Sequence, residues 1–204
     1  VMVGGSGMYI DAVCKGLDDF PPVPDSIREE LNLRHQNEGL DALKEELMKL
    51  DPDYHELVDS SNPHRIIRAI EVCMVSGKPF SSFRKQHAKK RNFKTVKIIL
   101  YRKREELYSR INKRVDKMMT EGLLEEVKKL YDYKDYNALQ TVGYKELIAY
   151  FDGEWDLETA IEEIKKNTRR YAKRQMTWFR RDPSNHFFKP ENESEIMAYL
   201  KENI

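Results

Sequence analysis

Apolar residues recur at helical spacing through the first half of the chain. In the segment 40–50, leucines stand three or four positions apart, as one buried face of an α-helix requires. A second helix is predicted over residues 25–37, with Asp25 as its N-terminal cap. Gly39 separates the two, because glycine is unfavourable inside a helix and favourable just past its end. The pattern therefore predicts two consecutive helices.

Two further helices are predicted to start at cap-like dipeptides. Asp51-Pro52 begins a short helix, and Asn62-Pro63 begins one that runs to about Ser76 and stops at Gly77. Asparagine is a favourable cap, and proline fits the first helical position. Because no strand-like alternation occurs between residues 22 and 93, we predict an all-helical block there.

Strand-like patterns flank this block on both sides. Val1 to Val3 resemble the end of a strand and lead through a glycine-rich turn into a predicted helix over residues 8–15. In the segment 93–101, apolar residues alternate with others at Val96, Ile98 and Leu100, which predicts a second, buried strand. Because a domain seldom begins with half a strand, we expect the natural protein to extend beyond Val1.

Helices dominate the rest of the chain. They are predicted over residues 104–121, 123–131, 144–151 and 157–181. Strands on each side of a helical block favour an α/β fold, in which an insertion interrupts a parallel sheet. We therefore expect a core of residues 1–21 and 94–204 and a helical insertion of residues 22–93.

The helix predicted over 157–181 separates cations from apolar side chains. At about 100° per residue, six cations fall on one arc of about 140°, and the opposite arc, which includes Tyr171, is expected to be buried. No acidic residue follows Glu163 in this helix, so the cations have no acidic partner within it. Such a surface favours a polyanion, whereas a solvated helix face is the alternative. The six cations are Arg169, Arg170, Lys173, Arg174, Arg180 and Arg181.

Overall charge does not make the protein a polycation. The chain has 36 basic and 35 acidic residues and a net charge of +1. Basic character is confined to Arg84–Lys97 and Arg169–Arg181, which indicates an oriented nucleic-acid surface.

The cysteines and the apolar runs exclude several classes of protein. Cys14 and Cys73 match neither a disulfide framework nor a zinc site. No apolar run approaches the roughly 18 residues of a membrane span, and no signal peptide is recognisable. We expect a cytoplasmic protein that does not enter membranes.

Two glycine-containing segments resemble phosphate-binding motifs, but only the first fits. Gly4-Gly5-Ser6-Gly7 follows a predicted strand and precedes a helix, so its N–H groups and hydroxyl are suited to a phosphate; a tight turn that needs glycines is the alternative. Ser76-Gly77-Lys78-Pro79 fails as a P-loop, because Val72 stands where the first glycine belongs and Pro79 where Ser or Thr belongs.

Two pairs of arginines stand one helical turn apart. Arg65 and Arg68 lie on the face that also carries Glu71, so they either contact phosphate or pair with that carboxylate. Arg110 and Arg114 are suited to a diphosphate, with surface ion pairing as the alternative.

A polar turn precedes the helix over 144–151. Thr141 is a candidate cap, Gln140 is suited to a base edge or a sugar, and Lys145 to a phosphate. A capped helix start is the alternative. No nucleophile triad, metal-ligand spacing or paired carboxylates emerge from the sequence.

Taken together and in this order, these segments resemble the tRNA dimethylallyltransferase (tRNA isopentenyltransferase) family. The resemblance covers nearly all 204 residues, and its last two stretches are highly specific as a pair. The matching stretches are Val3–Ile10, Asp51-Pro52, Asn62–Val72, Arg114–Val127, Ala138–Leu147 and Thr168–Arg180.

The resemblance implies a fold and a reaction. The core resembles that of P-loop NTPases, although its P-loop and the family's catalytic Asp would lie upstream of Val1. The family transfers a dimethylallyl group from dimethylallyl diphosphate to the exocyclic amine of an adenine beside the tRNA anticodon, usually with Mg²⁺, and the adenine must be flipped out. A monomer is implied. This chain alone is expected to bind RNA weakly and to be inactive.

The resemblance also implies roles for individual residues. Ser6 stands where the family usually has Thr, near the flipped adenine; Arg114, with Arg110 second, resembles the diphosphate ligand, and Gly4 and Gly5 belong to the same subsite. Expected tRNA contacts are Ser6, Arg28, His64, Arg65, Ile66, Ile67, Arg68, Gln140, Thr141, Val142, Gly143, Tyr144, Lys145, Lys173, Arg174, Gln175, Met176, Thr177, Trp178, Phe179 and Arg180.

Two other functions remain open at this point. One is a prenyltransferase that acts on free AMP or ATP, although a mononucleotide needs neither the basic last helix nor a helical insertion. The other is a helical RNA-binding module without catalytic activity, which would bind RNA tightly and with a steep salt dependence.

Overall fold

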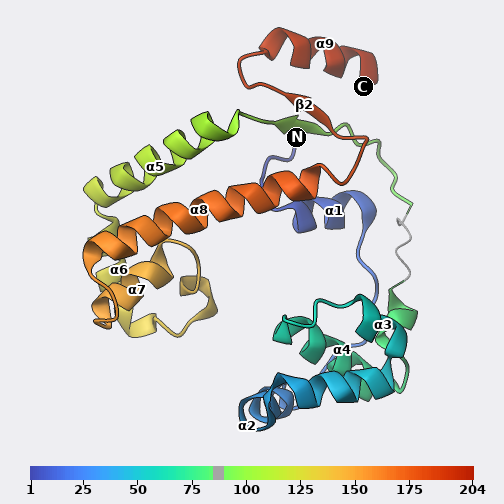
Figure 1. The fold of residues 1–204 in the computed structure, drawn as a ribbon. Coiled ribbons are helices and arrows are strands. Elements are labelled where there is room, and N and C mark those ends of the chain that lie inside the picture. The colour runs from blue at the N-terminus through green and yellow to red at the C-terminus, as the bar shows by residue number, and fades with distance from the viewer. Residues whose placement is uncertain (85–89) are drawn as a thin grey trace. The chain divides into compact units, whose positions relative to one another are not determined.

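The computed structural model describes residues 1–84 and 90–204 (Figure 1). It contains two compact units. The first consists of Val1–Ile10 and Phe93–Ile204, and the second of Asp11–Asn92. Helix α1 (Gly7–Lys15) belongs partly to each. The domain boundaries predicted from sequence were residues 22 and 93.

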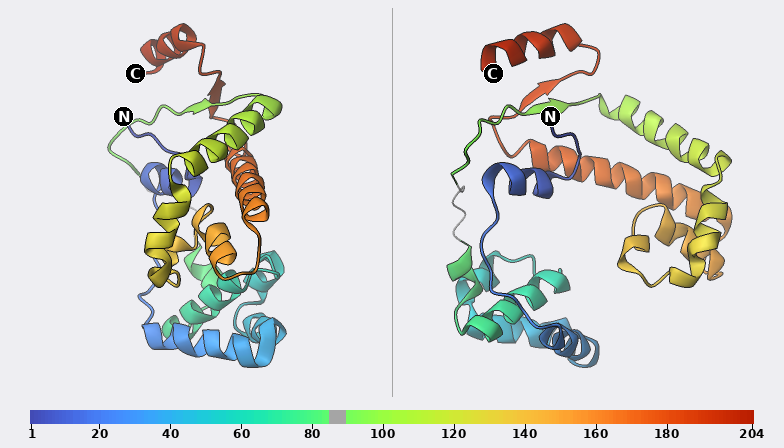
Figure 2. Two further views of the ribbon diagram at one scale, coloured as in Figure 1. Left: turned by 90° about the vertical axis from the view of Figure 1, so that its left-hand side faces the viewer. Right: turned by 180° about the vertical axis from the view of Figure 1, so that it is seen from behind.

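The first unit combines a small parallel sheet with long helices. Strand β1 (Ile98–Leu100) pairs with β2 (His186–Phe188) in the register Ile98–His186, Ile99–Phe187 and Leu100–Phe188. Helices α5 (Arg104–Thr120) and α8 (Leu157–Phe179) lie side by side (Figure 2). The remaining elements are α6 (Leu123–Leu130), η2 (Tyr131–Tyr133), η3 (Asn137–Leu139), α7 (Tyr144–Phe151) and α9 (Glu193–Asn203).

The core of this unit is built where four helices meet. Val115 of α5, Val127 of α6, Leu147 of α7 and Ile164 of α8 are almost completely buried against one another. Each lies on the apolar stripe of an amphipathic helix, so burial of these stripes holds the helices together.

The second unit is all-helical in its described residues. It contains α2 (Asp25–Leu50), α3 (Pro52–Leu57), α4 (Pro63–Ser76) and the 3₁₀ turn η1 (Phe80–Phe83). Gly39, with φ of 82°, breaks α2 where the sequence predicted a separation. The core is formed by apolar residues of α2 and α4 together with Tyr54 and Phe80.

Two of the three α-helix starts in this unit follow the predicted cap chemistry, whereas the prediction for α2 is wrong, because Pro24 rather than Asp25 occupies its cap position and no side chain caps it. The Asp51 carboxylate accepts a hydrogen bond from the Tyr54 N–H at 3.0 Å, and Asn62 accepts one from the Arg65 N–H at 3.4 Å. Asp51 also accepts from the N–H and hydroxyl of Ser81, so its buried charge has three donors. Gly77 ends α4 in the left-handed conformation with φ of 64°.

The strand predictions were the least accurate. Val1 to Val3 form no strand, and Val1 and Val3 are fully or almost fully exposed, because a strand needs a hydrogen-bonded neighbour and the described sheet contains only β1 and β2. The strand predicted over 93–101 spans only Ile98–Leu100, and Leu100 is 55% exposed rather than buried. Neither β2 nor α9 was predicted. The helix-dominated fold with a parallel sheet is confirmed.

Candidate nucleic-acid interface

The glycine-rich turn lies directly against α8. The side-chain amide of Gln175 donates a hydrogen bond to the Gly5 carbonyl at 2.8 Å. A Cβ added at Gly5 would lie 2.2 Å from Nε2 of Gln175, and one at Gly7 would lie 2.2 Å from Cδ1 of Trp178. The structure therefore brings together the turn and the helix that carries the cations.

Close approach, rather than backbone conformation, explains two of these glycines. Gly4, Gly5 and Gly7 do not have positive φ angles, so the turn itself does not need glycine. The alternative explanation offered by the sequence, a tight turn that requires glycine, is wrong for this segment. Glycine is needed at position 7, because the Trp178 ring of α8 occupies the space that a side chain would fill; at position 5 that space holds the end of the flexible Gln175 side chain.

The two halves of α8 treat their cations differently. In the N-terminal half, Lys165 pairs with Asp116 at 2.7 Å and with Glu162 at 2.9 Å, and Lys166 pairs with Glu163 at 2.6 Å. Past Arg169 the pairing ends. Among the residues that the structure describes, Arg170, Lys173, Arg174, Arg180 and Arg181 form no ion pair, and all five are exposed.

Neutral groups hold several of these cations in place. Arg169 donates to the Asn112 side-chain oxygen at 2.7 Å, which ties α8 to α5. Arg174 lies 5.8 Å from the ring centroid of Tyr171, and Arg181 lies 5.3 Å from that of Trp178. Tyr171, which was expected to be buried, is 45% exposed. These contacts orient the guanidinium groups and leave their charge uncompensated. We call Arg170, Lys173, Arg174, Arg180 and Arg181 the α8 cation stripe.

The arginines of α5 are also uncompensated. Arg110 and Arg114 are exposed and one turn apart, and neither forms an ion pair with any residue in the described ranges. The surface ion-pair alternative for this pair is therefore not observed. Both guanidinium groups remain available to an anion.

A buried carboxylate holds the turn before α7 in place through hydrogen bonds. Glu146 is 1% exposed and accepts hydrogen bonds from the Gly143 N–H at 2.7 Å and from the Asn167 side chain of α8 at 2.8 Å. Thr141 is not the cap, because its hydroxyl donates to the Ala138 carbonyl and Gly143 occupies the cap position. Glu146 thus fastens the turn to α8, a role that the sequence did not predict.

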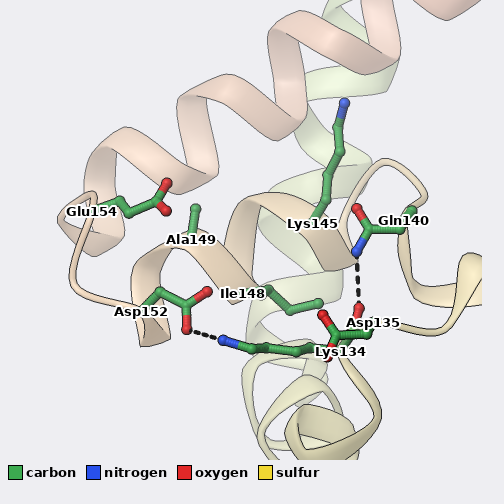
Figure 3. Close-up of a pocket in the computed structure, with 8 residues that line it drawn as sticks. All are labelled: Lys134, Asp135, Gln140, Lys145, Ile148, Ala149, Asp152 and Glu154. Atoms are coloured by element: carbon green, nitrogen blue, oxygen red, sulfur yellow. Dashed lines mark hydrogen bonds and ion pairs between the residues drawn. The ribbon is translucent and has the colours of Figure 1, made fainter. Parts of the chain in front are cut away.

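Gln140 and Lys145 line a hollow beside this turn (Figure 3). Its volume is about 270 Å³, and Lys134 and Asp152 form a 2.6 Å ion pair on its wall. Gln140 donates to the Lys134 carbonyl at 2.8 Å, while Lys145 extends away from that ion pair. The hydrogen bond between Lys134 and Asp152 lowers the pKa of the Asp152 carboxyl and raises the pKa of the Lys134 ammonium group. The hollow is polar and open, with the Lys145 charge at its edge.

In the second unit, Glu71 organises the predicted RNA-contacting arginines. It is 1% exposed and accepts from Arg28 at 2.7 and 3.0 Å and from Arg68 at 3.1 Å. Burial raises the pKa of the Glu71 carboxyl, but the hydrogen bonds and charges of the two arginines outweigh it, so that the pKa lies below its ordinary value. The ion-pair alternative from the sequence is therefore observed for Arg68.

The other residues of the His64–Arg68 segment divide by burial. Ile66 and Ile67 are 0% and 5% exposed and pack in the core, so their side chains are not accessible to RNA. His64 and Arg65 are exposed. His64 lines a hollow of about 300 Å³ with Arg28, Asn32, Ile67, Arg68 and Glu71. An anion here would meet guanidinium groups that a carboxylate already holds in place.

Several described cations of the basic segment 84–97 are engaged within the protein. Arg84 lies 5.1 Å from the Tyr54 ring centroid, Arg91 donates to the Ala12 carbonyl, and Lys97 pairs with Asp182 at 3.2 Å. Residues 85–89 lie outside the described residues. Lys90 is exposed, and the second basic RNA surface stays a prediction.

The described residues offer no metal site of their own. No three His, Cys, Asp or Glu side chains gather closely enough in residues 1–84 and 90–204 to hold an ion. We assign the expected Mg²⁺ to no residue of these ranges and derive no step from it, so it stays a prediction. Within the same ranges, no helix has the length and apolar character needed to cross a membrane.

Comparison with known proteins identifies the family. Residues 1–182 match the family model described as IPP transferase. The chain belongs to the IPP transferase family. A tRNA dimethylallyltransferase of Christiangramia forsetii is 56% identical over 205 residues, which cover 100% of this chain and 68% of the relative. The tRNA dimethylallyltransferase 1 of Bacteroides fragilis is 53% identical, with the same coverage.

Solved structures of IPP transferases share the fold. The full-length tRNA isopentenylpyrophosphate transferase of Bacillus halodurans is 36% identical with a TM-score of 0.58, and the match covers 97% of this chain and 64% of that one. A eukaryotic dimethylallyltransferase acting on tRNA is 29% identical with a TM-score of 0.67, over 87% of this chain and 46% of that one. This IPP transferase chain thus spans about two thirds of the length of its bacterial relatives. The resemblance found in the sequence is confirmed.

Proposed function

We propose that this protein transfers a dimethylallyl group from dimethylallyl diphosphate to the N6 amine of the adenosine beside the anticodon of a tRNA. In this reaction N6 forms a bond to the allylic carbon, the bond from that carbon to the diphosphate oxygen breaks, and diphosphate and a proton are released. The family and the named activity of its relatives support the enzyme class. The seating of the glycine turn against α8 carries the proposal for this chain.

The geometry supports a division of labour within the first unit. The α8 cation stripe ends beside a turn that offers backbone N–H groups and the Ser6 hydroxyl, so a phosphate chain that follows the stripe reaches the turn. On a helical wheel Trp178 lies about 40° from Arg174, at the edge of the stripe. Arg114 and Arg110 are proposed to bind the diphosphate, because both are uncompensated cations on the helix that packs against α8.

The second unit is proposed to contact the anticodon stem-loop through Arg28, His64 and Arg65. A carboxylate holds Arg28, which restricts its conformations before RNA arrives and lowers the entropy cost of binding. We further propose a cytoplasmic monomer, since the substrate would be tRNA and the family resemblance implies a monomer. Mg²⁺ is retained only as a proposed requirement of the reaction.

The test uses the complete gene product with labelled dimethylallyl diphosphate and three acceptors. These are a tRNA with adenosine beside the anticodon, the same tRNA with guanosine at that position, and AMP. Label in the first acceptor alone supports the proposal. Label in AMP at comparable efficiency would favour a free-nucleotide prenyltransferase, and tight RNA binding without any transfer would favour a binding module. An EDTA arm tests the Mg²⁺ requirement.

A further inference from the structure

The three glycines of the Gly4–Gly7 turn differ in what surrounds them. A Cβ at Gly4 would meet nothing within 4 Å. A Cβ at Gly5 would lie 2.2 Å from the Gln175 amide nitrogen, and one at Gly7 would lie 2.2, 2.5 and 2.6 Å from three atoms of the Trp178 indole. None of the three has a positive φ angle. Only the last two positions therefore depend on α8.

We propose that Gln175 and Trp178 are positioning residues, which act on the glycine turn and through it on Ser6, rather than RNA contacts. This deepens the proposed function and rests on it. The segment 173–180 then has two roles. Its cations face RNA, while Gln175 and Trp178 fix the turn on the neighbouring arc of the helix.

The hydrogen bond and the ring restrain the turn at two points. Gln175 holds the Gly5 carbonyl at 2.8 Å, which fixes the peptide that connects Gly5 to Ser6. The Trp178 ring lies against Gly7, so the residue after Ser6 is restrained as well. The Ser6 carbonyl accepts from the Ile10 N–H in the first turn of α1, which adds a third constraint. Ser6, which is half-buried, is thereby held from both sides.

This arrangement predicts a specific kinetic signature. A change of the turn should misplace Ser6 relative to the reacting adenine without removing a cation from the RNA surface. Misplacement of a positioned group by about 1 Å can cost about 100-fold in rate. Loss of a phosphate contact instead weakens RNA binding and its salt dependence. Loss of positioning should therefore lower kcat, whereas loss of a phosphate contact should raise the KM for tRNA.

The experiment compares Gly7→Ala with Gly4→Ala in the complete gene product. Both add one methyl group to the same turn, but only Gly7→Ala places it against a rigid ring. We expect Gly7→Ala to lower kcat at least about tenfold with the KM for tRNA nearly unchanged, and Gly4→Ala, whose methyl group meets no atom within 4 Å, to lower kcat less than Gly7→Ala does. Arg174→Ala should raise KM for tRNA and leave kcat unchanged. Gln175→Glu, which replaces the donor by an acceptor facing the Gly5 carbonyl, should follow the Gly7→Ala pattern.

A rescue variant separates positioning from a folding defect. Trp178→Ala removes the ring that the new methyl group would strike. Gly7→Ala combined with Trp178→Ala should therefore be no slower than Trp178→Ala alone. Equal kcat for Gly7→Ala and Gly4→Ala, or a KM effect of Gln175→Glu equal to that of Arg174→Ala, would overturn the proposal.

Tryptophan fluorescence tests the contact between Gly7 and the Trp178 ring independently of enzyme activity. The sequence contains two tryptophans, so Trp155→Phe, together with replacement of any further tryptophan of the complete gene product by Phe, isolates the Trp178 signal. In that background Gly7→Ala should shift the emission maximum and Gly4→Ala should not. If neither shifts it, the contact is absent and the inference fails. If the wild-type protein transfers no dimethylallyl group while the emission shift is seen, the proposed function fails and the contact stands.

Discussion

Helices α4 and α8 both carry arginines at helical spacing, yet they leave these cations in opposite electrostatic states. On α4, Arg68 shares the buried carboxylate of Glu71 with Arg28 of α2. On α8, the cation stripe forms no ion pair with the described residues, and its arginines are oriented instead by the rings of Tyr171 and Trp178. Spacing alone therefore does not show whether an arginine is available to an anion.

The position of acidic residues explains the difference. Glu71 follows Arg68 by three positions, so one turn of helix brings them together, and the α2–α4 packing adds Arg28. After Glu163, α8 has no acidic residue with which its cations can pair. The first arrangement stabilises the fold and pre-orients two arginines, and the second keeps charge for a ligand.

The largest effect is expected from Glu71→Gln. It removes the charge that two arginines share, and we expect it to destabilise the second unit by about 2 kcal/mol at pH 7. A larger loss is not expected, because the Arg28 side chain is 53% exposed and regains water. Native-state hydrogen exchange of the α4 amides measures it. Glu29→Gln, a change of an exposed glutamate on α2, is the matched control.

The same variant gives a pH test with a defined sign. Because the folded-state pKa of Glu71 is below its ordinary value, its stabilising effect is present above pH 4.5 and is lost as pH falls through the folded-state pKa. Protection of α4 should therefore decrease on acidification more in the wild type than in Glu71→Gln. Parallel curves for the two proteins would contradict the interpretation of Glu71 as a charged anchor.

The next effect concerns RNA. Replacement of Lys173 and Arg174 by Ala should weaken tRNA binding about tenfold and reduce the slope of log K against log salt by about 1 to 2, because two phosphate contacts are lost. The control replaces Lys44 and Lys117, which pair with acidic residues three and four positions away at 2.8 and 3.4 Å. If both double variants change the slope of log K against log salt equally, the α8 cation stripe has no special role in RNA binding, and the proposed contrast with α4 is wrong.

Local signals in the sequence predicted the helices well. Caps at Asp51 and Asn62, the break at Gly39 and the stop at Gly77 all depend on neighbouring residues, and all are observed. The sheet was predicted poorly, because β1 and β2 are three residues each and 88 positions separate the paired residues in the chain. A pairing of that range leaves no periodic trace in so short a segment.

The site shows the same division between local and distant determinants. The α8 cation stripe was predictable, because helical geometry and the absence of acidic residues define it. The reason for glycine at positions 5 and 7 was not predictable, because the side chains next to them come from a distant part of the sequence. Gln175, for example, follows Gly5 by 170 positions. Glu146 and Asn167, 21 positions apart, were missed for a similar reason.

A smaller effect is expected from Asn167→Ala. Glu71 has cationic partners, whereas the second buried glutamate, Glu146, has mainly neutral ones, the Gly143 N–H and the Asn167 amide. Loss of the amide leaves one carboxylate oxygen without its neutral donor, and we expect a destabilisation of about 1 kcal/mol in the first unit. Thermal unfolding followed by near-UV circular dichroism measures it. Asn137→Ala, at an exposed site, should have almost no effect.

The smallest effects concern the first turns of the two helices. The Asn62 side chain caps α4 through a 3.4 Å bond, so Asn62→Ala should cost only about 0.5 kcal/mol. Asp156 caps α8 through a 2.7 Å bond from the Thr159 N–H, and this bond lowers the pKa of the Asp156 carboxyl. Asp156→Ala should therefore reduce hydrogen-exchange protection of the first α8 turn more than Asn62→Ala does for α4.

Acid should remove the stabilising contribution of the cap in α8 but not that of the cap in α4. The Asp156 contribution is present at neutral pH and is lost as pH falls through its folded-state pKa, below the ordinary value of 3.8. Asn62 does not titrate, so its contribution should persist. If the Asp156→Ala effect survives at low pH, its cap does not depend on charge, and the two helices start by the same neutral mechanism. The contrast between α4 and α8 would then be confined to the cations, where the absence of acidic partners along α8 produces it.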